Sequence, residues 1–259
     1  MAAGERFERL VEIMRALRRG CPWDRSQSRE TLRAFLLEET YEVLAALDEG
    51  RHDELREELG DLLLQIVFHA ELAQEEGLFD IEDVLEGINE KLVRRHPHVF
   101  ADAQADTPGE VVRRWENIKT RVENKGSFLN GVPAALPALL RAVRVLTKVR
   151  QTGVDPLPPE EAGAEAQGWL ARLAEPADGD GEGAETAAGM LCLAAAALAM
   201  EQGANPEDGL RRVLGRLTQA FQRQEAALEE QGRSFDDLSD EELRRIAARL
   251  MKACRGERE

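Results

Sequence analysis

The sequence predicts an all-α protein built from helical bundles. Ala, Leu, Glu and Arg dominate its 259 residues, of which only 5% are aromatic, and this composition favours helix. Apolar residues recur three and four positions apart along most of the chain, which is the spacing of one buried helix face. Capping residues, Gly and Pro lie between these segments. These observations predict a series of amphipathic helices.

The first predicted helix ends near Gly20. Its apolar stripe consists of Phe7, Leu10, Val11, Met14 and Leu17. Pro22 then interrupts the chain, because proline cannot continue a helix that precedes it. Trp23 beside it offers a large anchor, for which core packing is the simple expectation. Ser26 or Ser28 is expected to cap the next helix.

A hairpin of two helices is predicted next. Apolar residues at helical spacing run from 36 to 47 and again from 55 to 66, with Gly50 between the runs. The short connection favours an antiparallel pair, and the second helix is expected to end at Gly77. Gly60 inside that helix is less favourable than Ala by about 1 kcal/mol. Its missing Cβ would let a neighbouring helix or a ligand approach closely, and tight helix packing alone is the alternative.

Acidic residues lie at helical spacing on both arms of this hairpin. They are Glu38, Glu39, Glu42, Glu58 and Asp61. Residues three or four positions apart share a helix face, so each arm presents an acidic pair. The two pairs can face each other, and their carboxylates would repel one another unless a cation lay among them. Oxygen ligands without Cys or His favour Mg²⁺ or Mn²⁺ over zinc. Two ordinary solvated helices with acidic outer faces are the alternative.

A cationic turn ends the following helix, which is expected to be capped by Asp80 and to run from 81 to about 95. Lys91, Arg94 and Arg95 form this turn. Cations complement the dipole at a helix C-terminus, and arginine also binds phosphate through paired donors. The turn is therefore either an ordinary helix end or a clamp for phosphates.

One more helix is expected before residue 130. His96 and His98 follow the cationic turn, and because no neighbour in the sequence completes a metal site, we interpret them as turn residues. Thr107 would cap the further helix. Trp115 and Lys119 lie four positions apart and share a face, where the indole could stack on a base and the ammonium could bind phosphate. Core packing is the alternative for Trp115 alone.

Several segments resemble one known family. The acidic pattern EExxE followed by ExxD resembles the all-α nucleoside triphosphate pyrophosphohydrolases, and the surrounding segments resemble MazG in particular. Those segments are CPWD (21–24), LEETYEV (37–43), GDLLLQIVFHA (60–70), KLVRRHPHVFAD (91–102) and RWENIK (114–119). The resemblance is close over residues 5–155 and weak thereafter.

The resemblance implies an enzyme that hydrolyses nucleoside or deoxynucleoside triphosphates to a monophosphate and pyrophosphate. It also implies a role in clearing noncanonical nucleotides, and a homodimer whose helices complete one bundle. By their position in the family pattern, the Mg²⁺ ligands would be Glu39, Glu42, Glu58 and Asp61. Glu38 would be catalytic, binding water or a second ion. The nucleotide-binding residues would be Lys91, Arg94, Arg95, Trp115 and Lys119.

The second half resembles a degenerate copy of the first, as in full-length MazG proteins with two such domains. We predict a catalytic domain over residues 1–130, a helical connector over 131–158 and a degenerate domain over 159–259. Residues 175–185 are expected to form a flexible loop, because they are rich in Gly and Asp.

The second copy lacks the acidic pairs. An alignment by eye replaces Asp61 by Met190 and Glu58 by Ala187. Where the first acidic pair would fall, the chain has Gly168, Trp169 and Arg172. The second domain is therefore predicted to bind no metal and to serve folding or assembly.

Composition limits the function further. The formal net charge of -16 argues against nonspecific nucleic-acid binding. Three scattered cysteines give neither a disulfide framework nor a zinc site. The start of the chain lacks the apolar core of a signal peptide, and the apolar run 190–200 is too short to cross a bilayer. We expect a cytoplasmic protein with a nucleotide substrate and neither a nucleic-acid nor a membrane partner.

Two alternatives stay open at this point. One is a narrower enzyme with the same metal site, such as a dUTP or dCTP pyrophosphatase. The other is a catalytically inactive, acidic helical interaction protein, which the degenerate second half suggests.

Overall fold

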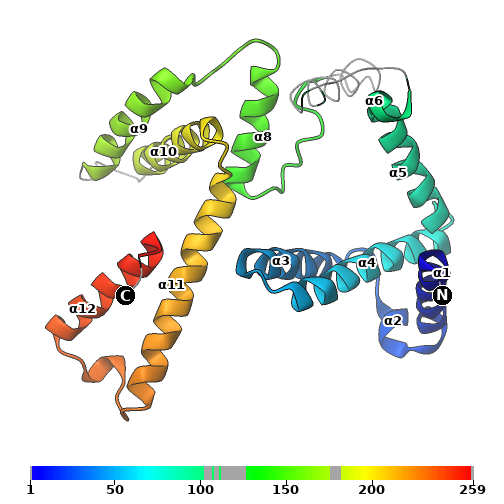
Figure 1. Ribbon diagram of the computed structural model, residues 1–259, viewed down its shortest axis with the longest axis horizontal. Coiled ribbons are helices and arrows are strands. Elements are labelled where there is room, and N and C mark those ends of the chain that lie inside the picture. Colours follow the sequence, from blue (N-terminus) through cyan, green and yellow to red (C-terminus); the bar gives the residue numbers. More distant parts are fainter. Residues whose placement is uncertain (1, 102–106, 108–110, 112–126, 176–181, 258–259) are drawn as a thin grey trace. The chain divides into compact units, whose positions relative to one another are not determined.

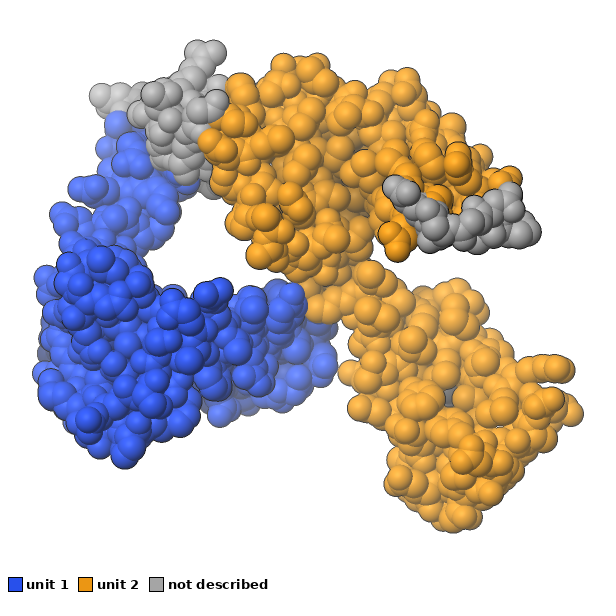
Figure 2. All heavy atoms as spheres, turned by 180° about the vertical axis from the view of Figure 1, so that it is seen from behind, with its two compact units in different colours: residues 1–123 blue, residues 124–259 orange. Residues whose placement is uncertain are grey.

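The protein folds into helices arranged in two compact units. The structure, a computed structural model, describes residues 2–101, 107, 111, 127–175 and 182–257. These described residues form helices and no β-strand, which confirms the predicted all-α class. The units comprise residues 1–123 and 124–259 (Figure 2). Each unit has its own apolar core.

The first unit is organised around a helical hairpin (Figure 1). Its described helices are α1 (Ala3–Gly20), α2 (Pro22–Ser26), α3 (Arg33–Glu49), α4 (His52–Glu75), α5 (Ile81–Arg95) and α6 (Pro97–Phe100). The hairpin consists of α3 and α4, as predicted. Gly50 joins them with φ of +67°, a left-handed conformation that glycine adopts without strain. Asp80 caps α5 by accepting from the backbone N–H groups of Glu82 and Asp83, at 2.8 and 3.1 Å.

The core of the first unit lies between α1, the start of α3, the second half of α4 and the start of α5. Its buried residues are Val11, Met14, Leu32, Val67, Phe68, Ala70, Leu72 and Ile81. Arg18 on α1 joins three of the helices. Its guanidinium donates to both carboxylate oxygens of Glu75 on α4, at 2.8 and 2.5 Å, and to the carbonyl oxygen of Asp24 on α2. These hydrogen bonds lower the pKa of Glu75.

The part of the hairpin nearest Gly50 extends beyond this core. It leaves large apolar side chains exposed, namely Leu37, Tyr41, Leu47, Leu59, Leu63 and Ile66. Gly60 lies among them, and a Cβ added there would meet nothing within 4 Å. The interpretation that Gly60 serves tight helix packing is therefore wrong within the first unit, and the space beside this glycine is open.

Pro22 separates two helices, as predicted: α1 ends at Gly20, and Pro22 opens the short helix α2, because its fixed φ suits the first helical position. Two other local predictions near the start of the chain are wrong. The indole of Trp23 is 52% exposed and is not a core anchor. Ser28 does not cap α3: its hydroxyl accepts from the N–H of Thr31 at 3.3 Å, which forms a separate turn before α3 begins at Arg33.

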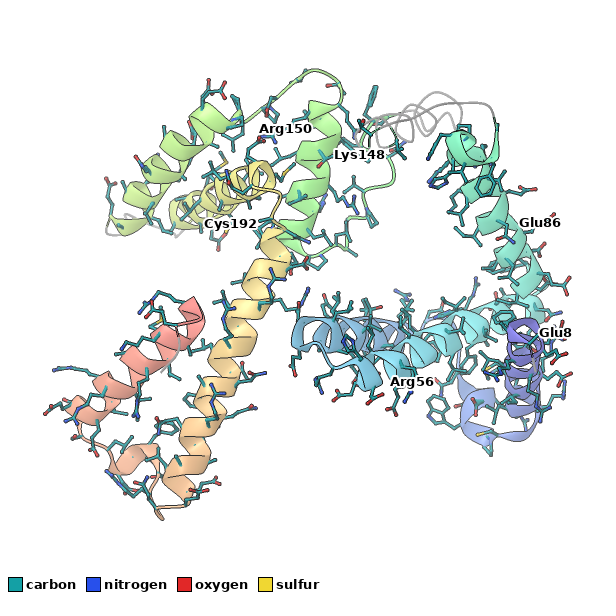
Figure 3. All side chains as sticks on the ribbon, viewed as in Figure 1. Glu8, Arg56, Glu86, Lys148, Arg150 and Cys192 are labelled. Atoms are coloured by element: carbon teal, nitrogen blue, oxygen red, sulfur yellow. The ribbon has the colours of Figure 1, made fainter. Side chains whose placement is uncertain are left out.

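The second unit has a core of small residues. Its described helices are α8 (Ala138–Arg150), α9 (Pro159–Ala174), α10 (Glu182–Glu201), α11 (Pro206–Glu229), the 3₁₀ turn η2 (Phe235–Asp237) and α12 (Asp240–Arg255). The residues buried between α8, α9 and α10 include Leu146, Leu157, Ala162, Ala194 and Ala197. Arg150 ends α8 (labelled in Figure 3) and donates to Glu201 at 2.7 Å and to the carbonyl oxygen of Leu157 at 3.0 Å. It thereby joins α8 to the end of α10.

Helix α10 is longer than the sequence suggested. It begins at Glu182, inside the predicted loop over 175–185, and residues 176–181 of that loop lie outside the described residues. Residues 183–201 have the length and composition of a membrane-spanning helix, with a mean hydropathy of 1.5. The expectation that no apolar run reaches that length is therefore wrong. Alanines of α10 contribute to the core of the second unit, and 22% of the span is buried.

Candidate metal centre

Three carboxylates meet across the hairpin of the first unit. Glu39 lies on α3, and Glu58 and Asp61 lie one turn apart on α4. One oxygen from each of the three side chains lies within 4.8 Å of the others, and all three side chains are half-buried. The facing arrangement expected from helical spacing is thus present for these three residues.

The other two acidic residues lie at the edge of this carboxylate cluster. Glu42 is exposed, yet it is close enough to hydrogen-bond the carboxyl of Glu39 and to repel that of Glu58. Glu38 is exposed and lies outside the cluster. The structure therefore gathers four of the five predicted acidic residues, with Glu42 as the outermost, and leaves Glu38 in solvent.

The electrostatics of the cluster favour a bound cation. Partial burial raises the pKa of Glu39, and the charges of Asp61 and Glu42 raise it further. Desolvation also raises the pKa of Glu58, again with contributions from Glu42 and Asp61. Opposite oxygen ligands of a divalent cation stand about 4 to 5 Å apart, since each bond is about 2.0 to 2.6 Å long. The donor set and its spacing therefore fit Mg²⁺ or Mn²⁺.

The raised pKa values predict opposite effects of pH on the metal-free and metal-bound protein. Without metal, the folded carboxyls hold protons more tightly than the unfolded ones, so their contribution to stability falls as pH rises from about 4.5 through the raised values. Mg²⁺ requires the ionised carboxylates, so its stabilisation is present at neutral pH and is lost as pH falls through the same range. At 100 times the Kd this stabilisation is about 2.7 kcal/mol.

Melting curves at pH 5 and pH 7.5, with Mg²⁺ and with EDTA, check this prediction. Mg²⁺ should raise the Tm at pH 7.5 by several degrees and have much less effect at pH 5. Glu39→Gln should melt higher than the wild type in EDTA at pH 7.5, because it removes a repelled charge, and it should respond little to Mg²⁺. An equal response of both proteins to Mg²⁺ would contradict the assignment of Glu39.

The cationic turn does not meet the carboxylate cluster within the first unit. Lys91 and Arg95 are half-buried, and Arg94 is exposed. Helix α4 ends at Glu75. The helical rise per residue places Asp61 about 21 Å before that end. From there α5 runs away from the hairpin and does not fold back along it (Figure 1). Among the described residues of one chain, the predicted metal and phosphate groups are thus separate.

Several predicted residues add little to the described site. Trp115 and Lys119 lie outside the described residues, as does the body of the helix predicted for them. The rings of His96 and His98 stand 5.6 Å apart. His96 places Nδ1 2.6 Å from the carbonyl oxygen of Leu92, which is consistent with a residue that closes the helix.

Sequence reasoning missed Gln65. This residue lies on α4 one turn after Asp61 and is only 6% exposed. Its Oε1 is buried and has no hydrogen-bond partner among the described residues. The signal was an amide within the otherwise apolar run of residues 62–68, LLLQIVF. A polar side chain at a buried helix position needs a partner, so it marks a position where function is to be sought.

Comparisons with known proteins assign the family. Residues 27–100 match the MazG nucleotide pyrophosphohydrolase domain. A protein of Thermotoga maritima named nucleoside triphosphate pyrophosphohydrolase/pyrophosphatase MazG is 39% identical over 245 residues, which cover 93% of this chain and 94% of the relative. The chain belongs to the MazG family. The resemblance and the prediction of an enzyme, a hydrolase of this family, are thereby confirmed.

Two further MazG relatives match a shorter part of the chain. The nucleoside triphosphate pyrophosphohydrolase of Escherichia coli K12 is 48% identical over 155 residues, or 58% of this chain and 59% of the relative. The enzyme of the same name from Mycobacterium tuberculosis is 39% identical over 153 residues, or 58% of this chain and 47% of the relative. The matched domain contains all five acidic residues and the cationic turn, and it ends before Trp115.

Proposed function

We propose that the chain hydrolyses nucleoside and deoxynucleoside triphosphates to the monophosphate and pyrophosphate, with Mg²⁺ as cofactor. The carboxylate cluster of Glu39, Glu58 and Asp61 carries this proposal, because it supplies three oxygen ligands from two facing helices. The names of the MazG relatives support the reaction. A role in clearing noncanonical nucleotides in the cytoplasm follows as part of the same proposal.

Each predicted residue has a role that its position allows. Glu39, Glu58 and Asp61 would hold the cation, with Glu42 completing the site from its edge. The bound ion would polarise phosphoryl oxygens and offset charge that develops during hydrolysis. Glu38, exposed beside the cluster, would accept a proton from the attacking water.

The cationic residues would act on the departing phosphates. Lys91, Arg94 and Arg95 would neutralise the pyrophosphate as it leaves, because charge-assisted hydrogen bonds to phosphate are strong. Trp115 and Lys119 would contact the nucleotide, as the resemblance implies. These last two assignments rest on the family pattern alone.

Product analysis of the full-length protein tests the reaction. With Mg²⁺ and a panel of ribo- and deoxynucleoside triphosphates, we expect equal amounts of monophosphate and pyrophosphate. A diphosphate with inorganic phosphate would show cleavage at the other anhydride bond and would refute the proposal. A single preferred pyrimidine would indicate the narrow dUTP or dCTP enzyme. No turnover on any triphosphate would favour an inactive interaction protein.

We also propose a homodimer in which the first units complete one another. The hairpin exposes several large apolar side chains on both of its helices, and exposed apolar patches mark interaction surfaces. Open space beside Gly60 leaves room there for a second helix. A partner subunit could also bring its cationic turn to the carboxylate cluster, which the turn of the same chain does not reach.

We propose, finally, that the second unit is a diverged copy that binds no metal. The segments AQEEG (73–77) and AMEQG (199–203) match, and each contains a glutamate held by an arginine from a preceding helix. Their glycines have similar positive φ angles of +70° and +66°. This match supports an alignment in which each residue of the first unit pairs with the residue 126 positions later in the second. The alignment by eye that paired Asp61 with Met190 differs from it by three residues.

In the new register, neither of the two ligand positions on α4 has a carboxylate counterpart on α10 of the second unit. This register pairs Asp61 with Ala187, which is fully buried, and Glu58 with Ala184. On α9 the same register pairs Glu42 with Gly168 and Glu39 with Glu165, whose carboxylate accepts from the indole Nε1 of Trp169 at 2.7 Å. We therefore assign the second unit, whose core includes Leu146 and Leu157 of the predicted connector, a role in folding or assembly.

A further inference from the structure

We propose that Gln65 and Trp23 form the subsite that recognises the nucleobase of the substrate. This inference rests on the proposed function and names the part of the site that distinguishes one nucleotide from another. The subsite would lie one helical turn from the carboxylate cluster, on the side of the hairpin that faces the core of the first unit.

Helix geometry places the two residues in the same region. Gln65 follows Asp61 by four residues on α4, so it shares a face with that carboxylate. Phe35 precedes Glu39 by four residues on α3 and shares its face in the same way. The helices α3 and α4 are antiparallel. Phe35, one turn before Glu39, and Gln65, one turn after Asp61, therefore lie on the same side of the carboxylate cluster. Trp23 contacts Phe35 there, with ring centres 5.7 Å apart.

The Gln65 side chain is the feature that requires a ligand. Gln65 and Asp24 are the two polar or charged side chains that are buried among the described residues. The Oε1 of Gln65 is buried and has no hydrogen-bond partner among these residues. An unpaired amide oxygen in an apolar core is unfavourable, and a ligand that reaches it would gain a hydrogen bond.

Trp23 supplies an aromatic surface beside that amide. Its ring meets Phe35 edge to face, at an interplanar angle of 79°, and its indole is about half exposed. Its carbonyl oxygen accepts from Ser26 Oγ at 2.7 Å and from Gln27 Nε2 at 3.1 Å, which fixes the backbone of α2. An exposed indole on a held backbone is a surface on which any base can stack.

The chemistry of the pair points to the base and not to the phosphates. A neutral amide offers one acceptor and two donors, which match the uncharged polar edge of a base. It provides no charge to offset phosphate, for which the cationic turn is available. Stacking on Trp23 would bind all bases, and hydrogen bonding to Gln65 would discriminate among them.

Binding measurements on the full-length protein test this subsite without catalysis. The probes are four nucleoside 5′-monophosphates and ribose 5-phosphate, which has no base, measured by calorimetry. Gln65→Leu should weaken the best-bound monophosphate about tenfold and reduce the spread among the four. Trp23→Leu should weaken all four to a similar extent. Neither change should alter the affinity for ribose 5-phosphate by more than about twofold.

A matched variant and a second substitution make the outcome decisive. Gln74→Leu changes the same residue type on the same helix, where the side chain is exposed and accepts from Arg15 at 3.3 Å, and it should change nothing. Gln65→Met keeps the length of the side chain and covers the case in which leucine disturbs the core. An unchanged spread among the monophosphates in both Gln65 variants would overturn the proposal. Base-dependent binding by a wild type that releases no pyrophosphate would uphold the subsite and refute only the proposed reaction.

Discussion

Asp61→Asn is expected to lower pyrophosphate release by about a thousandfold, the scale seen when one group that stabilises transition-state charge is removed. Asp61 belongs to the carboxylate cluster on α4, within 4.8 Å of oxygens on Glu39 and Glu58. Asparagine keeps the shape of the side chain and removes its charge, so the cation would be held by fewer anionic ligands. Steady-state pyrophosphate release at saturating Mg²⁺ measures the effect.

The control for Asp61→Asn lies on the same helix. Glu57→Gln removes one negative charge from an exposed position of α4 outside the cluster and should retain activity within about threefold. The melting temperature of Asp61→Asn in EDTA should equal or exceed that of the wild type, since the neighbouring carboxyls repel Asp61. Full activity in Asp61→Asn would exclude the cluster as the metal centre.

Local sequence signals predicted the main helices of the first unit, α1, α3, α4 and α5, and most of their ends. The break at Gly50 and the cap at Asp80 depend on residues that act on their own backbone, so they can be read without knowledge of the fold. The helical spacing of the acidic residues and the short turn of the hairpin also predicted that Glu39 would face Glu58 and Asp61. The prediction that Ser28 caps α3 failed because Ser28 pairs with Thr31 instead. The side-chain oxygen of each residue accepts from the backbone N–H of the other, which forms a separate turn.

The features that sequence reasoning missed depend on contacts between distant segments. Nothing near Trp23 in the sequence indicates that its ring packs against Phe35 in a T-shaped pair and stays about half exposed. The direction of α5 is likewise set by the packing of Ile81 and Val84 on the core, and the helix then leaves the hairpin. Spacing alone placed the cationic turn at a helix end, and only the fold separates it from the carboxylate cluster.

Mixing two inactive variants is expected to restore activity if the proposed dimer shares its sites. One variant carries Asp61→Asn, and the other carries Lys91→Ala with Arg95→Ala. In a heterodimer, the intact carboxylate cluster of the second variant would face the intact cationic turn of the first. Random exchange makes half of the dimers mixed, and one of two sites in each would work, so about a quarter of wild-type activity should return.

The same mixing distinguishes a shared site from one completed within a single chain. If each chain used its own cationic turn, both sites of every heterodimer would lack a component, and activity would stay at the level of the separate variants. A mixture of Asp61→Asn with Glu58→Gln serves as the control, because both changes affect the carboxylate cluster and neither chain can complement the other. Recovery in the first mixture alone would show that the open face of the hairpin and the distant turn of α5 are two halves of one site.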